Sequence, residues 1–189
     1  FRVAGRTGDL TPLALLAGAD SVVLDSTLLD LTLTGPPERR RIQGHADAFR
    51  LLYAGTLAER LTAEGTGTLD SAGTSAFAGR LRVVGAAVGK LSVRRVDLAA
   101  RYDSVVALQG SVIVNDDIGL ALNLAGRASG DSTRATLRQL DLSEGGRKWK
   151  LAQPAALALR PDVVEVRGFA LGAGDRSIDL DGIFARSEE

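Results

Sequence analysis

Few residues of this chain belong to the types that catalysis or metal binding usually requires. The sequence holds one histidine, His45, and no cysteine. Without cysteine, disulfides, thiolate nucleophiles and cysteine-based zinc sites are excluded. His45 lies in the segment RIQGHADAF, with no serine or acidic partner at the spacing of a known catalytic motif. A triad or metal site assembled through space stays open, but a surface histidine is the favoured interpretation.

Paired carboxylates are the second possible source of chemistry, because a glycosidase works with two of them. The pairs are Asp116 with Asp117, Asp162 with Glu165, and Asp179 with Asp181. The first pair falls in a predicted turn, and the last alternates with apolar residues, as on the solvated side of a strand. The sequence therefore predicts no catalytic residues and no enzyme activity.

The glycine-rich segment GAGDRSIDLDG, from Gly172 to Gly182, is the remaining candidate for binding. It is similar to the turns that bind calcium in parallel β-rolls, but it lacks their tandem nonapeptide register. The glycines also do not follow a strand and open a helix, as a phosphate-binding loop would. We expect no metal ion and no cofactor.

Composition sets the class of protein that must position these residues. The 189 residues are 45% hydrophobic, 24% charged and only 4% aromatic, with 22 glycines. This composition folds, as one domain or as an elongated stack. The 23 basic and 23 acidic residues balance, so no overall basic field favours nucleic acid. The local exception, Arg39-Arg40-Arg41, is interpreted as a solvated loop and strand edge.

The chain shows no signal for a membrane-spanning helix. Its longest comparable apolar segment, Leu13 to Ala19, is far shorter than the ~18 to 20 residues that cross a bilayer. It begins with Phe1 and contains no methionine. We therefore expect a fragment from inside a larger protein, with residues 1–189 forming a single elongated β-rich module.

Hydrophobic residues alternate with polar ones throughout the chain, as in strands with one apolar face. Leu29, Leu31 and Leu33 begin this pattern. The later positions predicted to line an apolar groove are Leu81, Val83, Leu91, Val93, Val106, Leu108, Val112, Val114, Leu120, Leu122, Leu124, Leu157, Leu159, Val164, Val166, Phe169, Leu171, Ile178 and Leu180. Because almost all are aliphatic, the sequence favours a long curved sheet over an aromatic-filled sandwich.

Glycine-bearing or aspartate-bearing breaks separate the alternating runs, so antiparallel strands joined by short turns are expected. They include Asn115-Asp116-Asp117, Glu144-Gly145-Gly146 and Gly172 to Asp175. Only Leu10 to Gly18 reads as a short helix. One helix cannot cover so many strands, and the sequence predicts an all-β, elongated, curved sheet, apolar within and polar without. Whether its interior is filled or open stays undecided at this point.

Residues 137–184 resemble part of the β-rich periplasmic region of the TamB family, the inner-membrane component of the translocation and assembly module, within the AsmA-like envelope proteins. The likeness rests on Leu140-Asp141-Leu142 before Gly145-Gly146, and on the WKLAQPA segment with Trp149, Leu151 and Pro154. It continues to Ile178-Asp179-Leu180-Asp181-Gly182, where the family has leucine at the first position. Residues 81–126 look like the preceding strand pairs, and residues 1–80 are similar only in texture.

This resemblance implies a sheet folded lengthwise into a taco-like groove with an aliphatic interior. It also implies a periplasmic protein, anchored to the inner membrane through a part absent from this chain, that carries phospholipid toward the outer membrane. The implied partners are phospholipid and an outer-membrane barrel protein of the TamA or BamA type, in support of outer-membrane biogenesis and protein secretion. Such transport would be passive, because an aliphatic wall shields lipid tails from water.

Two other non-enzymatic function classes remain, and an enzyme acting on polysaccharide is the last alternative, which would first require a cleft with convergent carboxylates. A chaperone-like scaffold would hold β-strands of outer-membrane proteins by strand addition. A purely structural β-solenoid would have a packed interior without a continuous cavity. In either case Trp149 is expected to be a packing anchor, and Pro154 to shape the start or edge of a strand.

Overall fold

A computed structural model describes residues 2–7, 22–23, 26–36, 38–53, 56–70, 73–88, 91–129 and 132–185 of the chain. Every element in these ranges is a β-strand. The helix expected over Leu10 to Gly18 lies outside the described residues. The strands are β1 (Arg2–Thr7), β2 (Val22–Val23), β3 (Ser26–Thr34), β4 (Arg39–Tyr53), β5 (Thr56–Asp70), β6 (Gly73–Val88), β7 (Leu91–Tyr102), β8 (Val106–Ile113), β9 (Gly119–Ser129), β10 (Ser132–Glu144), β11 (Arg147–Leu151), β12 (Ala155–Arg160), β13 (Val163–Ala173) and β14 (Arg176–Ala185).

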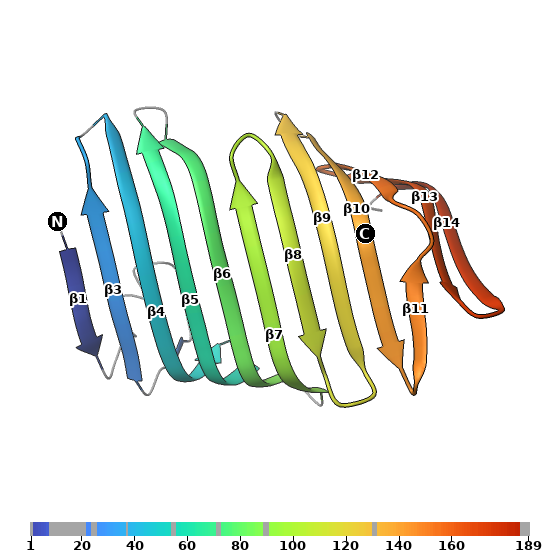
Figure 1. Cartoon of the computed structure of the whole chain (residues 1–189), viewed down its shortest axis with the longest axis horizontal. Helices are drawn as coiled ribbons and strands as arrows, with labels where there is room; N and C mark the ends of the chain where they lie inside the picture. Colours follow the sequence, from blue (N-terminus) through green and yellow to red (C-terminus); the bar gives the residue numbers. More distant parts are fainter. Residues whose placement is uncertain are drawn as a thin grey trace.

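The strands form one antiparallel sheet of fourteen strands in which neighbours in sequence are mostly neighbours in space. From β3 to β10 each strand pairs with the next along the chain. Figure 1 shows these strands side by side in a single curved layer. This confirms the expected all-β, elongated, curved sheet, which short turns between alternating runs produce.

The predicted turns fall where the chain reverses. Gly145 and Gly146 connect β10 to β11 with φ angles of 54° and 74°, a left-handed conformation that glycine adopts without steric cost. The turn between β8 and β9 is closed by the Asn115 side chain, whose oxygen accepts hydrogen bonds from the backbone N–H groups of Asp117 and Ile118. Such Asx turns explain why asparagine and aspartate gather there.

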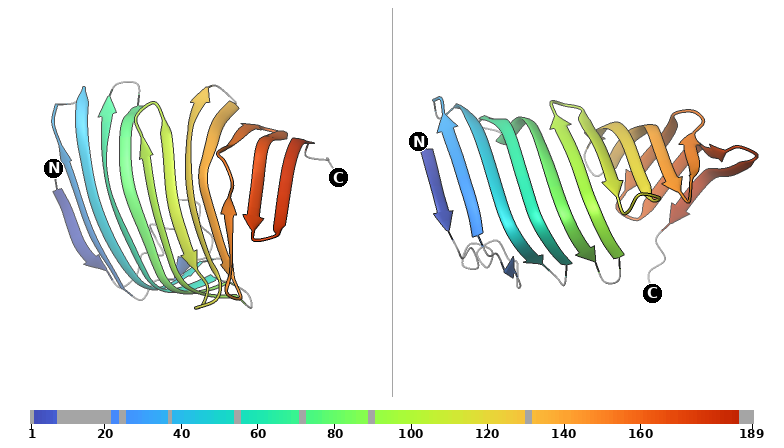
Figure 2. Two further views of the ribbon diagram at one scale, coloured as in Figure 1. Left: turned by 45° about the vertical axis from the view of Figure 1, so that its right-hand side comes forward. Right: turned by 60° about the horizontal axis from the view of Figure 1, so that its bottom comes forward.

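A line of irregularities crosses the last strands and bends the sheet. The register of β10 shifts at Arg138, the chain breaks between β11 and β12 around Pro154, and β13 shifts again at Gly168. Gly168 has a φ of 67°, and its N–H donates to Asp181 Oδ2 at 3.0 Å. Because bulges bend a strand and increase its twist, β11 to β14 turn away from the direction of β3 to β8, as Figure 2 shows.

The two faces of the sheet differ sharply in polarity, because side chains alternate along each strand. We call them the apolar face, which carries Leu29, Leu81 and Leu98, and the polar face, which carries Asp47, Thr62 and Arg82. The most buried cluster joins Ala58, Ala86 and Val93 near one end of the strands. Within the described residues, no large side chain is fully buried.

Candidate functional site

Cross-strand register arranges the apolar face in continuous rows. Partners in an antiparallel sheet place their side chains on the same face, so each row can be followed from strand to strand. One row runs from β3 to β10 through Leu29, Ala46, Ala63, Leu81, Leu98, Gly110, Leu122 and Leu140. A parallel row contains Leu61, Val83, Val96, Val112, Leu120, Leu142 and Trp149. The apolar face is therefore unbroken across the middle of the sheet.

Small residues hollow out the centre of the apolar face. Gly44, Gly65 and Gly79 are consecutive partners on β4, β5 and β6. A Cβ atom on Gly79 would lie 2.6 Å from Cζ of Phe77, so the ring lies against the bare backbone of that residue. The resulting hollow has a volume of about 610 Å³ and is lined by Leu29, Ile42, Phe77, Leu81, Leu98 and Leu108 among others.

Large hydrophobic side chains of this face remain partly open to solvent. Leu31 is 38% exposed, Phe77 44% and Tyr102 38%. Their rows contain no charged side chain between β3 and β9. Within the described ranges no second layer covers them, and the face is an exposed apolar surface of the kind that usually marks a binding site.

Most of the residues predicted to line an apolar groove share this face. Leu81 and Leu108 line the central hollow. The register places the following on the same rows or on their continuation beyond the bend: Val83, Val106, Val112, Leu120, Leu122, Leu124, Leu157, Leu159, Val164, Val166, Phe169, Leu171, Ile178 and Leu180.

The remaining three lie apart from the central hollow. Leu91 and Val114 lie at strand ends and line, with Val93, a separate shallow hollow. Val93 is itself buried against Ala58 and Ala86. The cluster that contains Val93 also packs against Val83, Val96 and Val112 of the second row, whereas Leu91 and Val114 lie near the ends of β7 and β8.

The residues of the WKLAQPA segment lie at the bend. Trp149 is half-buried and pairs across the sheet with Leu142, while Leu151 pairs with Leu171. Pro154 immediately precedes β12, and Gly182 pairs with Val166. Trp149 thus lies at the end of an aliphatic row, and Pro154 lies where a strand begins.

The polar face carries its own network of charges. Ion pairs on this face and at the strand ends join Arg2 with Asp30, Arg60 with Asp47, Arg80 with Glu64, Arg82 and Arg95 with Asp97, Arg94 with Asp116, and Arg101 with Asp103. Hydrogen bonds from Arg95 and then Arg82 hold the pKa of Asp97 below its usual value. Exposed pairs of this kind contribute little to stability individually.

His45 has an acidic partner that the sequence motifs did not indicate. Its Nε2 lies 3.0 Å from Oδ2 of Asp47, and Oδ1 of the same carboxylate accepts a hydrogen bond from Thr62 Oγ1 at 2.7 Å. The Thr62 hydroxyl, with smaller effects of His45 and Arg60, lowers the pKa of Asp47 from 3.8 to about 2 despite partial burial. Since the hydroxyl donates to the carboxylate and not to the imidazole, these groups are not ordered as a nucleophilic triad.

Each carboxylate pair has at least one member in a structural contact. Asp116 pairs with Arg94, and Glu165 with Arg167. Asp179 accepts a hydrogen bond from Ser177, and Asp181 from the backbone of Gly168. Within the part of the chain that the structure describes, no group of three or more histidine, aspartate or glutamate side chains is placed to hold a metal ion.

The central glycines and Phe77 are the residues of this site that sequence reasoning missed. Glycine has no hydrophobicity of its own, and it was associated with turns. A signal was nevertheless present, because Gly65 and Gly67 occupy alternate positions of a strand in which the positions between them are polar. Glycine within a strand often marks a place where another group approaches the backbone closely.

No known protein family matches this chain, and neither a curated protein nor a solved structure matches it. Among the described residues there is also no helix long and apolar enough to cross a membrane.

Proposed function

We propose that the apolar face carries or shields the acyl chains of phospholipids. The observation that supports this most directly is the unbroken aliphatic surface, hollowed at Gly44, Gly65 and Gly79 and left uncovered within the described residues. A filled solenoid would enclose large side chains completely, whereas this face leaves Leu31, Phe77 and Tyr102 partly exposed. The resemblance of residues 137–184 to the TamB family points to the same ligand.

The energetics suit a passive carrier. Removing a lipid tail from water is worth about 0.8 kcal/mol per methylene. The row from Leu29 to Leu140 crosses eight strands, about 34 Å at the usual spacing of ~4.8 Å between strands. One leaflet of a bilayer contributes only half of a hydrocarbon core of ~30 Å. The row is therefore long enough for a whole acyl chain lying across the strands.

A carrier must also release what it holds. The row contains only leucine, alanine and glycine, so no hydrogen bond fixes a tail at one position. Headgroups would stay in water at the margin of the face. In this proposal the chain is part of a periplasmic protein anchored to the inner membrane, which acts with an outer-membrane barrel of the TamA or BamA type.

The test fills the hollow without adding charge. In the variant Gly44→Leu, the new side chain would contact Leu31, since a Cβ at Gly44 lies 3.4 Å from Leu31 Cδ1. We expect the purified wild-type chain to retain phospholipid, measured by extraction and mass spectrometry, and the variant to lose most of it. A photoreactive residue at position 108 should crosslink to lipid in the wild-type background and not in Gly44→Leu.

A second pair of variants separates the two faces. Leu108→Asp places a charge in the hollow, whereas Ala107→Asp places the same charge on the polar face, between Arg101 and Ala125. We expect only Leu108→Asp to abolish lipid retention, with circular dichroism confirming that both variants stay folded. Equal retention in wild type, Gly44→Leu and Leu108→Asp would overturn the proposal.

The chaperone-like alternative has its own support at the edge of the sheet. Within the described residues β14 pairs only with β13, and its Ile183 and Phe184 are 70% and 45% exposed. An exposed, partly hydrophobic edge strand is a template for strand addition. Chains that bind strand peptides but copurify with no lipid would favour this function over the first.

A further inference from the structure

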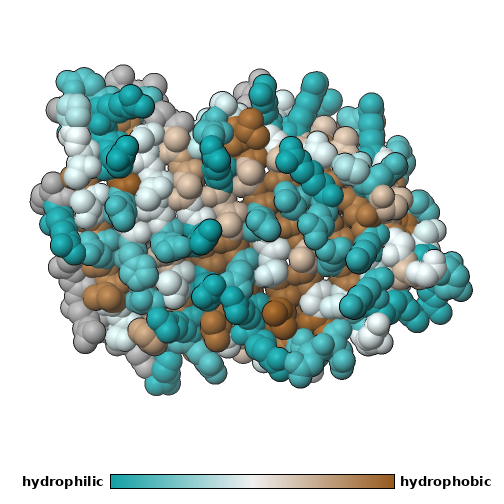
Figure 3. Space-filling model, viewed as in Figure 1, coloured by the Kyte–Doolittle hydropathy of each residue, from teal (hydrophilic) through white to brown (hydrophobic). Residues whose placement is uncertain are grey.

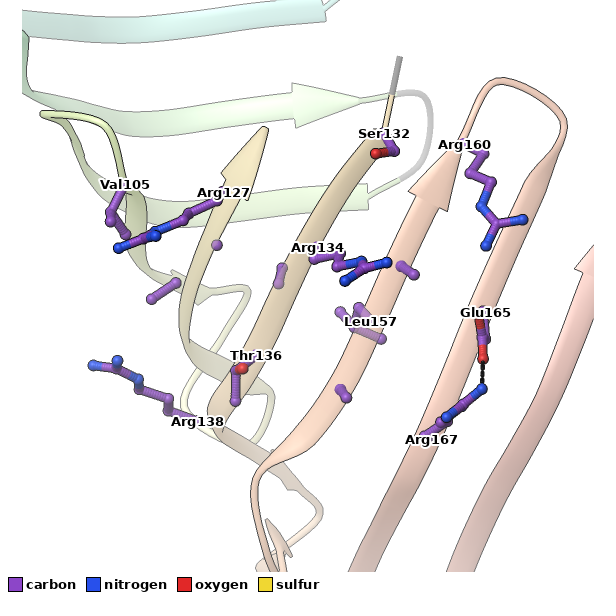
Figure 4. A pocket seen from close by; sticks show the side chains of 15 residues that line it. Val105, Arg127, Ser132, Arg134, Thr136, Arg138, Leu157, Arg160, Glu165 and Arg167 are labelled. Atoms are coloured by element: carbon purple, nitrogen blue, oxygen red, sulfur yellow. Dashed lines mark ion pairs between the residues drawn. The ribbon is translucent and has the colours of Figure 1, made fainter. Parts of the chain in front are cut away.

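A second hollow lies on the polar face of the sheet, next to the bend. It is distinct from the hollow on the apolar face at Gly44, Gly65 and Gly79. It has a volume of about 940 Å³, and its lining includes Arg127, Arg134, Arg138, Arg160 and Arg167, with Glu165 as the one acidic residue. Figure 4 shows this hollow with its labelled side chains. Five arginines against one glutamate leave an excess of four positive charges in one concave surface.

The register places like charges directly opposite each other at this point. Arg127 on β9 is the cross-strand partner of Arg134 on β10, an arrangement that destabilises a sheet. The side chains of Arg127 and Arg134 extend to opposite sides in Figure 4. A chain that is neutral overall thus concentrates positive charge where its own fold disfavours it.

These arginines differ from those on the rest of the polar face in their partners. From β3 to β8, Arg60, Arg80 and Arg82 each pair with an acidic side chain. In the hollow only Arg167 does so, with Glu165. Among the described residues, no ion pair involves Arg127, Arg134, Arg138 or Arg160.

The floor between the arginines consists of small residues. Ala158 on β12 is the partner of Arg134 on one side and of Glu165 on the other. Ala156 is likewise the partner of Thr136 and Arg167. Figure 4 shows Arg134 extending from β10 toward β12, and Arg160 extending toward Glu165. Space is therefore left over β12, with guanidinium groups on both sides.

We propose that this hollow binds a phosphate group of an anionic ligand over Ala156 and Ala158, between Arg134 and Arg160. Guanidinium groups donate two parallel hydrogen bonds to a phosphate and remain charged at any physiological pH. Arg167, held by Glu165, adds a third positive group beside the floor. Arg127 and Arg138 raise the positive potential at the opposite rim, which accelerates capture of an anion.

This site does not depend on the lipid proposal, because it lies on the other face of the sheet. Its ligand chemistry has two possible sources, a soluble phosphate compound or the headgroup of an anionic lipid. A lipid held by its headgroup here would keep its tails away from the glycine-floored hollow. The two proposals therefore fail or succeed in separate experiments.

The test measures pyrophosphate binding to the whole chain by isothermal titration calorimetry at low ionic strength. Removing one guanidinium in Arg134→Gln or Arg160→Gln should weaken binding about tenfold, the effect of losing one charge-assisted pair. The control Arg147→Gln/Arg176→Gln removes two exposed arginines outside the hollow and should bind as wild type does. An equal loss in this control, or no saturable binding by the wild type, would overturn the site.

A larger side chain at Ala158 tests whether the ligand lies over β12. Ala158→Glu places a carboxylate between Arg134 and Glu165, and we expect it to abolish binding, with circular dichroism confirming that the unliganded chain stays folded. Pyrophosphate should raise the melting temperature of the wild type and not of this variant. Unchanged binding by Ala158→Glu would show that the phosphate does not lie over β12, contrary to the proposal.

Vesicles identify the source of the phosphate. Cosedimentation with cardiolipin-containing vesicles but not with phosphatidylcholine vesicles, lost in Arg134→Gln, would assign the site to a lipid headgroup. Pyrophosphate binding without cosedimentation would assign it to a soluble ligand. Failure of both probes would contradict the proposal.

Discussion

The two faces of this single sheet differ in how their side chains are satisfied. On the polar face, threonines and ion pairs such as Arg82 with Asp97 complement each other across neighbouring strands. On the apolar face, rows of leucine and valine continue across the same strands with no layer over them in the described residues. Figure 3 shows one face of the molecule, where hydrophobic surface lies between hydrophilic side chains. From β3 to β8 the charged side chains of the polar face find partners within the sheet, whereas the apolar face is left partly exposed.

The difference is a matter of what each face needs for stability. A folded chain normally buries large hydrophobic side chains, each worth about 1.5 to 3 kcal/mol when fully removed from water. Here no large side chain among the described residues reaches full burial, so part of this hydrophobic stabilisation is not gained by folding alone. A bound acyl chain would bury these side chains further and supply the remaining stabilisation. The comparison predicts that substitutions act by face, even between adjacent residues.

The largest effect is expected from a charge on the apolar face. Leu98 lies over Gly110, whose Cβ would come within 2.7 Å of Leu98 Cδ2. Leu98→Asp removes this apolar contact and should lower the free energy of unfolding by about 2 to 3 kcal/mol. Ala99→Asp puts the same charge opposite Arg80 and should change it by no more than about 0.5 kcal/mol. Urea denaturation followed by circular dichroism measures both, and equal losses would contradict the division into two faces.

The alternation of leucine and valine predicted which side chains share a face, because a pleated strand has a period of two residues. Leu81, Leu108 and Leu122 are placed as expected for that reason. His45 and Asp47 obey the same rule, and their spacing of two residues on a strand could have predicted their contact.

Other features depend on pairing between distant segments and carry no local signal. The bend requires the irregularity at Arg138 to meet those at Pro154 and Gly168, which only the register of β10, β12 and β13 determines. The meeting of Arg127 with Arg134 has the same origin. The hollow was missed because its floor is glycine, whose effect is the absence of a side chain.

A slightly smaller effect on stability is expected when alanine replaces glycine at two places on the apolar face. Gly79 lies at its open centre, and Gly126 lies on β9, where the neighbouring backbone is close. A Cβ at Gly126 would lie 2.5 Å from the backbone oxygen of Arg134 and 2.8 Å from Cβ of Ala135. Gly126→Ala must displace backbone, and we expect it to cost about 2 kcal/mol. At Gly79 the closest atom belongs to the ring of Phe77, which is 44% exposed, and we expect this ring to turn aside.

Gly79→Ala should therefore cost less than about 1 kcal/mol, because the added methyl group also restricts the unfolded chain. Thermal unfolding of the two variants, which differ from wild type by the same methyl group, provides the comparison. If Gly79→Ala were as destabilising as Gly126→Ala, the ring of Phe77 would be held rigidly, and the centre of the face would be closed instead of open.

The smallest effect concerns the polar face and its dependence on pH. Because the folded pKa of Asp47 is lowered from 3.8 to about 2, its interactions stabilise the fold above pH 3.8 and are lost as the pH falls toward 2. Thr62→Val removes the hydrogen bond that contributes most to this shift. We expect the variant to be about 1 kcal/mol less stable than wild type near neutral pH, with the difference vanishing near pH 2.

Thr66→Val is the matched control, since Thr66 lies on the same strand and face, opposite Gln43 and Ala78. It should leave the pH dependence of stability unchanged. The carboxyl carbon of Asp47, followed by NMR, should titrate closer to its ordinary pKa in Thr62→Val and as in wild type in Thr66→Val. If the pKa of Asp47 were the same in Thr62→Val as in wild type, Arg60 and His45 would hold the carboxylate. Charge, and not hydrogen bonding by hydroxyl groups, would then organise the polar face.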